Sequence, residues 1–214
     1  FGADLTSRAV AGNVGATSMR ELLLGAGRAG HQAWKRLICD GSPQWSENLV
    51  TLDFNSTCNP DVVWDLNNLP LPFQDNEFDE VHAYHTLEHF GAQGDWRAFL
   101  SFFSEIWRIL KPGGYFAGIT PSAESVWAWA DPGHTRLIML ESLVFLKQPE
   151  YQRQCGVTPM TDYRPFYQAD FDIHSIQRGP NENCFILHAV KPSRYVPPGV
   201  EIFARHQLAA VVTA

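Results

Sequence analysis

Short runs of apolar residues alternate with polar and glycine-rich segments along the first 120 residues of the chain. Such runs, bounded by turn residues, are typical of strands buried on both faces of a parallel sheet. Two further apolar runs flank a Gly-Pro-Asn connection at 179–181, which is typical of a hairpin. The predicted strands are residues 19–24, 48–53, 62–64, 78–84, 115–120, 171–177 and 184–191.

Two segments between these strands have apolar residues at helical spacing. Residues 31–39 show the spacing after a glycine-rich turn, so we expect a helix there. A longer amphipathic pattern runs from Asp95 to Leu110, with Asp95 as its N-cap and a Lys-Pro-Gly-Gly stop at 111–114. This alternation predicts an α/β fold, a three-layer Rossmann-like doubly wound sheet that is mostly parallel, with an antiparallel C-terminal hairpin strand.

The chain is expected to form a single domain over residues 1–214. Residues 1–18 are small and polar without a period, so they predict a loose N-terminal arm. Residues 193–214 contain two consecutive prolines and are interpreted as a tail and a candidate homodimer contact. Residues 121–170 are too long for a plain connection and are rich in aromatics. They predict a helical hairpin packed on the sheet, a lid or substrate insertion over a pocket, or both.

Composition narrows the partners that the protein can have. The 16 Lys and Arg against 23 Asp and Glu give a net charge of −7, which disfavours nucleic acid and anionic membrane surfaces. No apolar run reaches the roughly 18 residues that a membrane span needs. The four cysteines are scattered and form no C-x-x-C pair, which favours reduced thiols and a cytoplasmic location.

The turn after the first strand carries the first chemical signal. Residues 25–30 read Gly-Ala-Gly-Arg-Ala-Gly, a pattern that lets the backbone approach a nucleotide closely. Asp53 ends the second strand, where a carboxylate can accept hydrogen bonds from ribose hydroxyls. Together they predict a nucleoside-bearing cofactor, and they leave a nicotinamide dinucleotide and S-adenosylmethionine both open.

The segments further along the chain favour S-adenosylmethionine. Residues 61–90 (DVVWDLNNLPLPFQDNEFDEVHAYHTLEHF) and 106–114 (IWRILKPGG) resemble class I S-adenosylmethionine-dependent methyltransferases of a small subgroup with Leu-Glu-His and Leu-Lys-Pro-Gly-Gly segments. The resemblance covers residues 20–120 strongly. It implies transfer of a methyl group from S-adenosylmethionine to a small-molecule or glycan-linked acceptor that the sequence does not identify.

Two other functions stay open at this point. The first is an NAD(P)-dependent oxidoreductase built on the same glycine turn. The Leu-Lys-Pro-Gly-Gly segment and the lack of a Tyr-x-x-x-Lys pair weigh against it. The second is a catalytically inactive methyltransferase-like binding protein. Leu23 supports it, because many members of the family carry an acid at this position, near the methionine ammonium. Glu21 lies two residues earlier and is expected to point the same way, about 7 Å further back along the strand.

The resemblance also implies roles for single residues. Asp53 would bind the ribose hydroxyls, and Asp65 would face the adenine amino group with the Leu66 backbone beside the ring. The glycines of the turn would let the backbone pass under the methionine part of the cofactor. The implied cofactor-binding residues are Gly25, Ala26, Gly27, Asp53, Phe54, Asp65, Leu66 and His85.

A sulfonium is already an activated methyl donor, so the protein must mainly align the acceptor and, for an oxygen or nitrogen nucleophile, remove a proton. His134 and His85 are the candidate catalytic bases, because the ordinary pKa of histidine lies near neutrality. Trp127 and Arg136 are candidates for substrate binding. We expect no metal site at His82, His85 and His89, since the first two should point to opposite faces of a strand.

Overall fold

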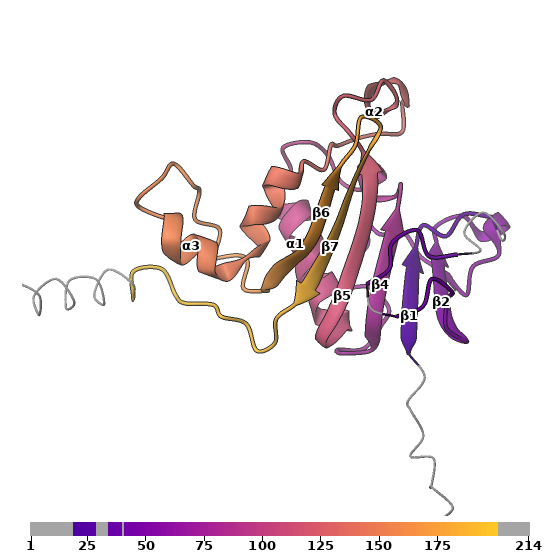
Figure 1. Ribbon diagram of the computed structural model, residues 1–214, viewed down its shortest axis with the longest axis horizontal. Coiled ribbons are helices and arrows are strands. Elements are labelled where there is room, and N and C mark those ends of the chain that lie inside the picture. The colour runs from indigo at the N-terminus through magenta and orange to yellow at the C-terminus, as the bar shows by residue number, and fades with distance from the viewer. Residues whose placement is uncertain (1–18, 29–33, 40, 201–214) are drawn as a thin grey trace, which may run out of the picture.

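The computed structural model describes residues 19–28, 34–39 and 41–200. Its centre is a seven-stranded sheet of order β3-β2-β1-β4-β5-β7-β6 (Figure 1). The first five strands run parallel, and β7 pairs antiparallel with both β5 and β6. The α/β class and the mostly parallel sheet with its C-terminal hairpin are therefore confirmed. The strands are β1 (Arg20–Leu24), β2 (Asn48–Asp53), β3 (Val62–Val63), β4 (Phe78–Tyr84), β5 (Leu110–Pro121), β6 (Phe171–Arg178) and β7 (Glu182–Ala189).

The long amphipathic helix is present as predicted. Helix α1 spans Trp96–Ile109, and the N-cap Asp95 accepts a hydrogen bond from the Ala98 N–H at 3.0 Å. The predicted fifth strand is too short, because β5 begins at Leu110, directly after the helix. Leu110 pairs with Phe78, so the Lys-Pro-Gly-Gly segment lies inside an irregular start of the strand.

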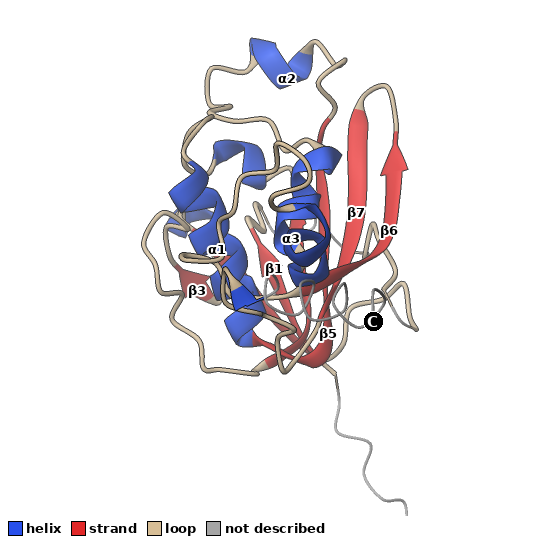
Figure 2. Ribbon diagram, turned by 90° about the vertical axis from the view of Figure 1, so that its left-hand side faces the viewer, coloured by secondary structure: helices blue, strands red, loops and turns tan. Residues whose placement is uncertain are grey.

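One face of the sheet carries the main core. Helix α1, the 3-10 helix η3 (Leu140–Leu146) and helix α3 (Gln148–Gln154) cover this face (Figure 2). The second half of the 121–170 segment therefore packs on the sheet, with buried side chains that include Leu143 and Tyr151. The short helix α2 (Trp127–Ala130) lies apart, beyond the carboxyl end of β5 (Figure 1).

The opposite face is covered differently from the prediction. The described part of the expected helix, residues 34–39, is irregular, and residues 31–33 lie outside the described residues. The Lys35 N–H donates to the Pro43 carbonyl at 3.0 Å, so the chain folds back on itself and does not continue as a helix. Leu37 and Trp45 from this irregular segment pack against Leu23. The predicted arm at 1–18 and the end of the tail, from residue 201, also lie outside the described residues.

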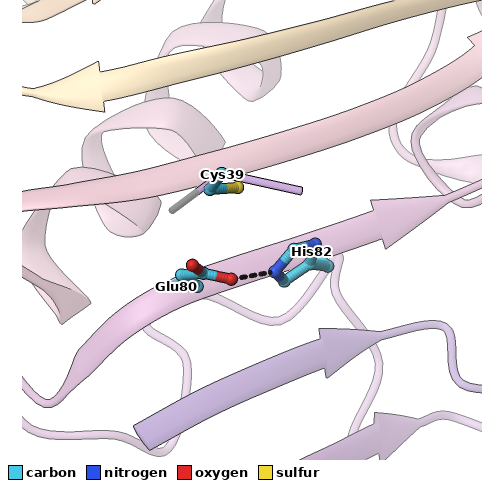
Figure 3. A group of neighbouring side chains, drawn as sticks. All are labelled: Cys39, Glu80 and His82. Atoms are coloured by element: carbon cyan, nitrogen blue, oxygen red, sulfur yellow. Dashed lines mark hydrogen bonds and ion pairs between the residues drawn. The ribbon is translucent and has the colours of Figure 1, made fainter. Parts of the chain in front are cut away.

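A buried charge cluster fixes the irregular segment to the sheet. The Lys35 Nζ forms ion pairs with Glu21 and with Glu80, the latter at 2.8 Å, and all three side chains are almost fully buried. His82 Nε2 lies 2.8 Å from the same Glu80 oxygen, with Cys39 facing both residues (Figure 3). Burial opposes the charge on Lys35, but its hydrogen bonds to the two carboxylates outweigh this and raise its pKa. Lys35 thus compensates one of the two carboxylate charges in this part of the core.

Within the described residues, no helix is both long enough and apolar enough to cross a lipid bilayer.

Candidate cofactor site

A cavity of about 440 Å³ lies where β1, β2 and β4 end. Ligands of open α/β sheets bind outside the carboxyl ends of the strands, and this volume is in the range of small-molecule sites. Its walls are formed by the loops that follow these three strands and by the loop that follows the short strand β3. It is lined by Gly25, Leu52, Asp53, Phe54, Trp64, Asp65, Leu66, Asn67, His85, Thr86, His89 and Phe90.

Asp53 joins two of these loops. Its Oδ2 accepts a hydrogen bond from the Gly27 N–H at 2.9 Å, and its Oδ1 accepts one from the Asn55 N–H at 2.8 Å. The Ala26 N–H donates to the Leu52 carbonyl at 3.1 Å, which holds the glycine turn against β2. The carboxylate of Asp53 therefore lines the cavity in a fixed orientation and keeps lone pairs for a ligand.

Gly25 is required by the packing of the turn as well as by its conformation. Its φ is +61°, and a Cβ added there would lie 2.2 Å from Thr86 Oγ1. That hydroxyl also lies 3.2 Å from both the Leu24 and the Tyr84 carbonyl oxygens, so it is held between two strands. Only glycine fits between β1 and the loop after β4.

Replacing Gly25 by alanine is expected to lower the free energy of unfolding by about 1–3 kcal/mol more than Gly27→Ala does. Gly27 has nearly the same φ, +62°, but a Cβ there meets nothing within 4 Å. The Gly27→Ala variant therefore measures the effect of backbone strain alone. Urea unfolding of both variants gives the difference. Equal stability of the two variants would contradict the close packing of Gly25 against Thr86.

The β2–β3 side of the cavity offers flat and polar surfaces. Phe54 is 75% exposed on the rim, and Leu66 is buried beside it. Asp65 Oδ1 accepts hydrogen bonds from the N–H and the side-chain amide of Asn67, both at 2.9 Å, which fixes the loop after β3. A planar, apolar ring with polar edges matches such a surface.

His85 follows directly on β4 and lies on the opposite side of the cavity. Its φ of +51° is uncommon for a residue with a side chain, and such strain is concentrated at functional sites. Its Nε2 lies 2.8 Å from Glu182 Oε1, and its Nδ1 lies 3.4 Å from Glu88 Oε1. The Glu88 carboxylate raises the pKa of His85 against the effect of burial, and Glu182 adds to the increase.

The comparison with protein families adds to this geometry. Residues 37–118, from the irregular segment to the middle of β5, match the family described as a methyltransferase domain. Over these residues the chain is therefore similar to methyltransferase domains. The match begins after the glycine turn. Gly25, which lines the cavity, and Gly27, whose N–H binds Asp53, are therefore assigned to the site by the structure alone.

The chain also aligns with solved structures. One is a SAM-dependent methyltransferase from Archaeoglobus fulgidus, at 14% identity and a TM-score of 0.48, covering 80% of this chain and 86% of that one. Another, from Mesorhizobium loti, has 17% identity and a TM-score of 0.44, covering 79% and 90%. At these values the neighbours say nothing about the acceptor. No curated protein matches the sequence.

The predicted substrate residues do not line this cavity. Trp127 is 70% exposed in α2, away from the lining. Arg136 is buried, and its guanidinium donates to the Ala92 and Asp95 carbonyls at the start of α1. These contacts satisfy Arg136 within the fold, so neither residue is part of the site that we describe.

His134 lies one layer behind the cavity. Its ring packs edge-on against His89 with 4.8 Å between the ring centroids, and His89 belongs to the lining. Its Nε2 lies 4.0 Å from Glu88 Oε1. Of the two candidate bases, His85 contacts the cavity directly and His134 reaches it only through His89.

The acid missing from β1 is not replaced from a neighbouring position. Leu23 packs in an apolar cluster, and Glu21 is bound to Lys35 and the Ser46 N–H. The carboxylates on the lining of the cavity are those of Asp53 and Asp65.

Sequence reasoning missed Glu88. It lies in the 3-10 helix η2 (Leu87–His89), its side chain is 2% exposed, and neither carboxylate oxygen has a hydrogen-bond partner. An acid between His85 and His89, just after a buried strand, is the pattern in the sequence that could have revealed it.

Proposed function

We propose that this cavity holds S-adenosylmethionine with its ribose on Asp53, and that the acceptor is a small molecule or a glycan-linked group. The observation that carries the proposal is the fixed Asp53 carboxylate, which lines the cavity between the glycine turn and the end of β2. Strand-end carboxylates at this position suit ribose hydroxyls.

The other cofactor contacts follow from this placement. The backbone of Gly25, Ala26 and Gly27 would run beside the methionine part, at the end of β1. The adenine would lie between Phe54 and Leu66, with its amino group toward Asp65. Stacking on Phe54 would cover the apolar ring that is now exposed on the rim.

The charge of the site supports a small acceptor. Among the described residues that line the cavity, Asp53 and Asp65 are acidic and none is lysine or arginine. A polyanion such as RNA would be repelled by such a lining and by the net charge of −7. A concave site at strand ends suits a ligand that enters the cavity.

The bound cofactor would supply an activated methyl group. The chain would hold the acceptor in line with it and exclude water. His85 lies on the side of the cavity opposite Phe54, so we propose that it contacts the acceptor. Its two ring nitrogens face Glu182 and Glu88, which fix the orientation of the imidazole.

Transfer of labelled methyl from S-adenosylmethionine tests the class of acceptor. The protein is incubated with separate fractions of small metabolites, oligosaccharides, RNA and protein. We expect label in one of the first two fractions, and none with Asp53→Ala. Label confined to RNA or protein would contradict the proposed acceptor, and no label in any fraction would favour a binding protein without turnover.

A further inference from the structure

A buried carboxylate without a lysine or arginine partner lies directly behind the cavity. Both oxygens of Glu88 are buried without a hydrogen-bond donor, which is strongly unfavourable for a charged group. Within the described residues, no lysine or arginine nitrogen lies within 4.0 Å of it, and the groups that face it are His85 and His134. His85 compensates the carboxylate only when its ring is protonated, so a bound cation would also be stabilised at this site.

Two histidines beside Glu88 have the tautomer that a metal ligand needs. Nδ1 of His89 lies 3.0 Å from the Gly133 carbonyl oxygen, and Nδ1 of His134 lies 3.4 Å from that of Ala128. A carbonyl oxygen only accepts, so each Nδ1 must carry the hydrogen in the neutral ring. Each Nε2 then keeps its lone pair. A histidine that binds a metal through one ring nitrogen usually donates the N–H of the other to an acceptor such as a backbone carbonyl.

The two segments that carry these residues are tied together. The N–H groups of Thr135 and Arg136 donate to the Glu88 carbonyl at 2.8 and 3.2 Å. One ligand atom each from Glu88, His89 and His134 lies within 4.8 Å of the other two. Ligand atoms of a tetrahedral metal with bonds of about 2.1 Å lie about 3.4 Å apart, so side-chain shifts of roughly 1 Å would close the site.

The described residues contain a second group of possible metal ligands, and in that group a lysine already pairs with the carboxylate. Cys39, Glu80 and His82 also lie within 4.8 Å of one another (Figure 3). There, however, the ammonium of Lys35 already neutralises the Glu80 carboxylate. In the part of the chain that the structure describes, Glu88 has no lysine or arginine in this role, and the His85 ring at 3.4 Å carries a charge only when it is protonated.

We propose that Glu88, His89 and His134 bind a divalent transition-metal ion such as Zn²⁺. Two imidazoles and one carboxylate are a common donor set for such ions and leave coordination positions open. His89 lines the cavity, so an open position can face an acceptor oxygen there; this last step rests on the proposed function. The pattern of His82, His85 and His89 did not predict the site, because His134 joins it from a distant segment.

Zinc binding to the tag-free, chelator-treated protein tests the proposal. Calorimetry with Zn²⁺ alone should show one ion per chain, and Co²⁺ should give a visible spectrum of nitrogen and oxygen ligation. Glu88→Gln and His134→Ala should each weaken binding at least about 100-fold, since even indirect partners of a metal contribute 10–100-fold. Glu124→Gln and His174→Ala, both at exposed positions, are the matched controls and should bind as the wild type does.

Two results would overturn the site: no stoichiometric Zn²⁺ binding by the wild type, or unchanged affinity in Glu88→Gln. Circular dichroism checks that each variant is folded. If His134→Ala does not fold, His89→Ala replaces it, because the His89 side chain is exposed. S-adenosylhomocysteine binding by the metal-free wild type is measured separately, so failure of the metal site and failure of the cofactor site are distinguishable.

Discussion

Replacing Lys35 by methionine is expected to lower the free energy of unfolding by about 3–5 kcal/mol, the usual cost of leaving a buried charge without its partner. Lys35 is the ammonium between Glu21 and Glu80, and all three side chains are at most 1% exposed. The variant would leave two carboxylates close together in the core. Chemical denaturation at neutral pH measures the loss.

The matched control is Lys147→Met. Lys147 pairs with Asp172 at 3.1 Å, but both side chains are about one-third exposed. Exposed pairs contribute about 0–1 kcal/mol, so this variant should be nearly as stable as the wild type. If both variants lose the same stability, the buried cluster does not have the importance that its geometry indicates.

The loss in Lys35→Met should also depend on pH. In the wild type, burial opposes ionisation of Glu80, but hydrogen bonds from His82 and Lys35 outweigh this and lower its pKa. Its contribution to stability is therefore present above the unfolded value of about 4.3 and is lost only as pH falls below it. Without Lys35 the buried carboxyls would have raised pKa values, so lowering the pH toward about 5 should reduce the difference between variant and wild type. A difference that stays constant with pH would contradict this explanation.

The Asp53→Ala variant is expected to bind S-adenosylhomocysteine about 10- to 100-fold more weakly than the wild type. Hydrogen bonds to a charged group contribute roughly 1.5–3 kcal/mol, and about 1.4 kcal/mol corresponds to a factor of ten. The variant also removes the acceptor that holds the Gly27 N–H. Calorimetric titration measures the dissociation constant.

Asp61→Ala is the matched control for this variant. Asp61 also binds β2, by accepting hydrogen bonds from the Thr51 N–H and hydroxyl at 2.8 and 2.7 Å, but it does not line the cavity. It should lose some stability and keep the affinity of the wild type for the cofactor product. Unchanged affinity in folded Asp53→Ala would mean that the cofactor binds elsewhere.

The sequence predicted the sheet well because its signals are local. The apolar run at 78–84 is bounded by polar residues and coincides with β4, and Asp95 caps α1 as expected. The helix expected at 31–39 is wrong over the described residues 34–39. Helical spacing there competes with a long-range interaction, the burial of Lys35 between two acids of the sheet.

Residues of the site could be predicted from the sequence where they lie at the end of a strand, because the position in the strand places them at one edge of the sheet. Asp53 and His85 come directly at or after strand ends, so the topology brings them to one edge. Arg136 and Trp127 were chosen as a basic and an aromatic residue of the 121–170 segment, and the type of a residue does not determine which way a loop faces. Whether Glu88 has a lysine or arginine partner depends on every residue that surrounds it in the fold, and the local sequence does not contain that information.

Binding of S-adenosylhomocysteine against NAD⁺ and NADP⁺, by calorimetry on the wild-type protein, tests the central claim most directly. We predict one site per chain for the first ligand and none for the dinucleotides. At about 100 times its dissociation constant, the ligand should add roughly 2.7 kcal/mol to stability and raise the melting temperature. Binding of NAD⁺ or NADP⁺ without binding of S-adenosylhomocysteine would contradict the account.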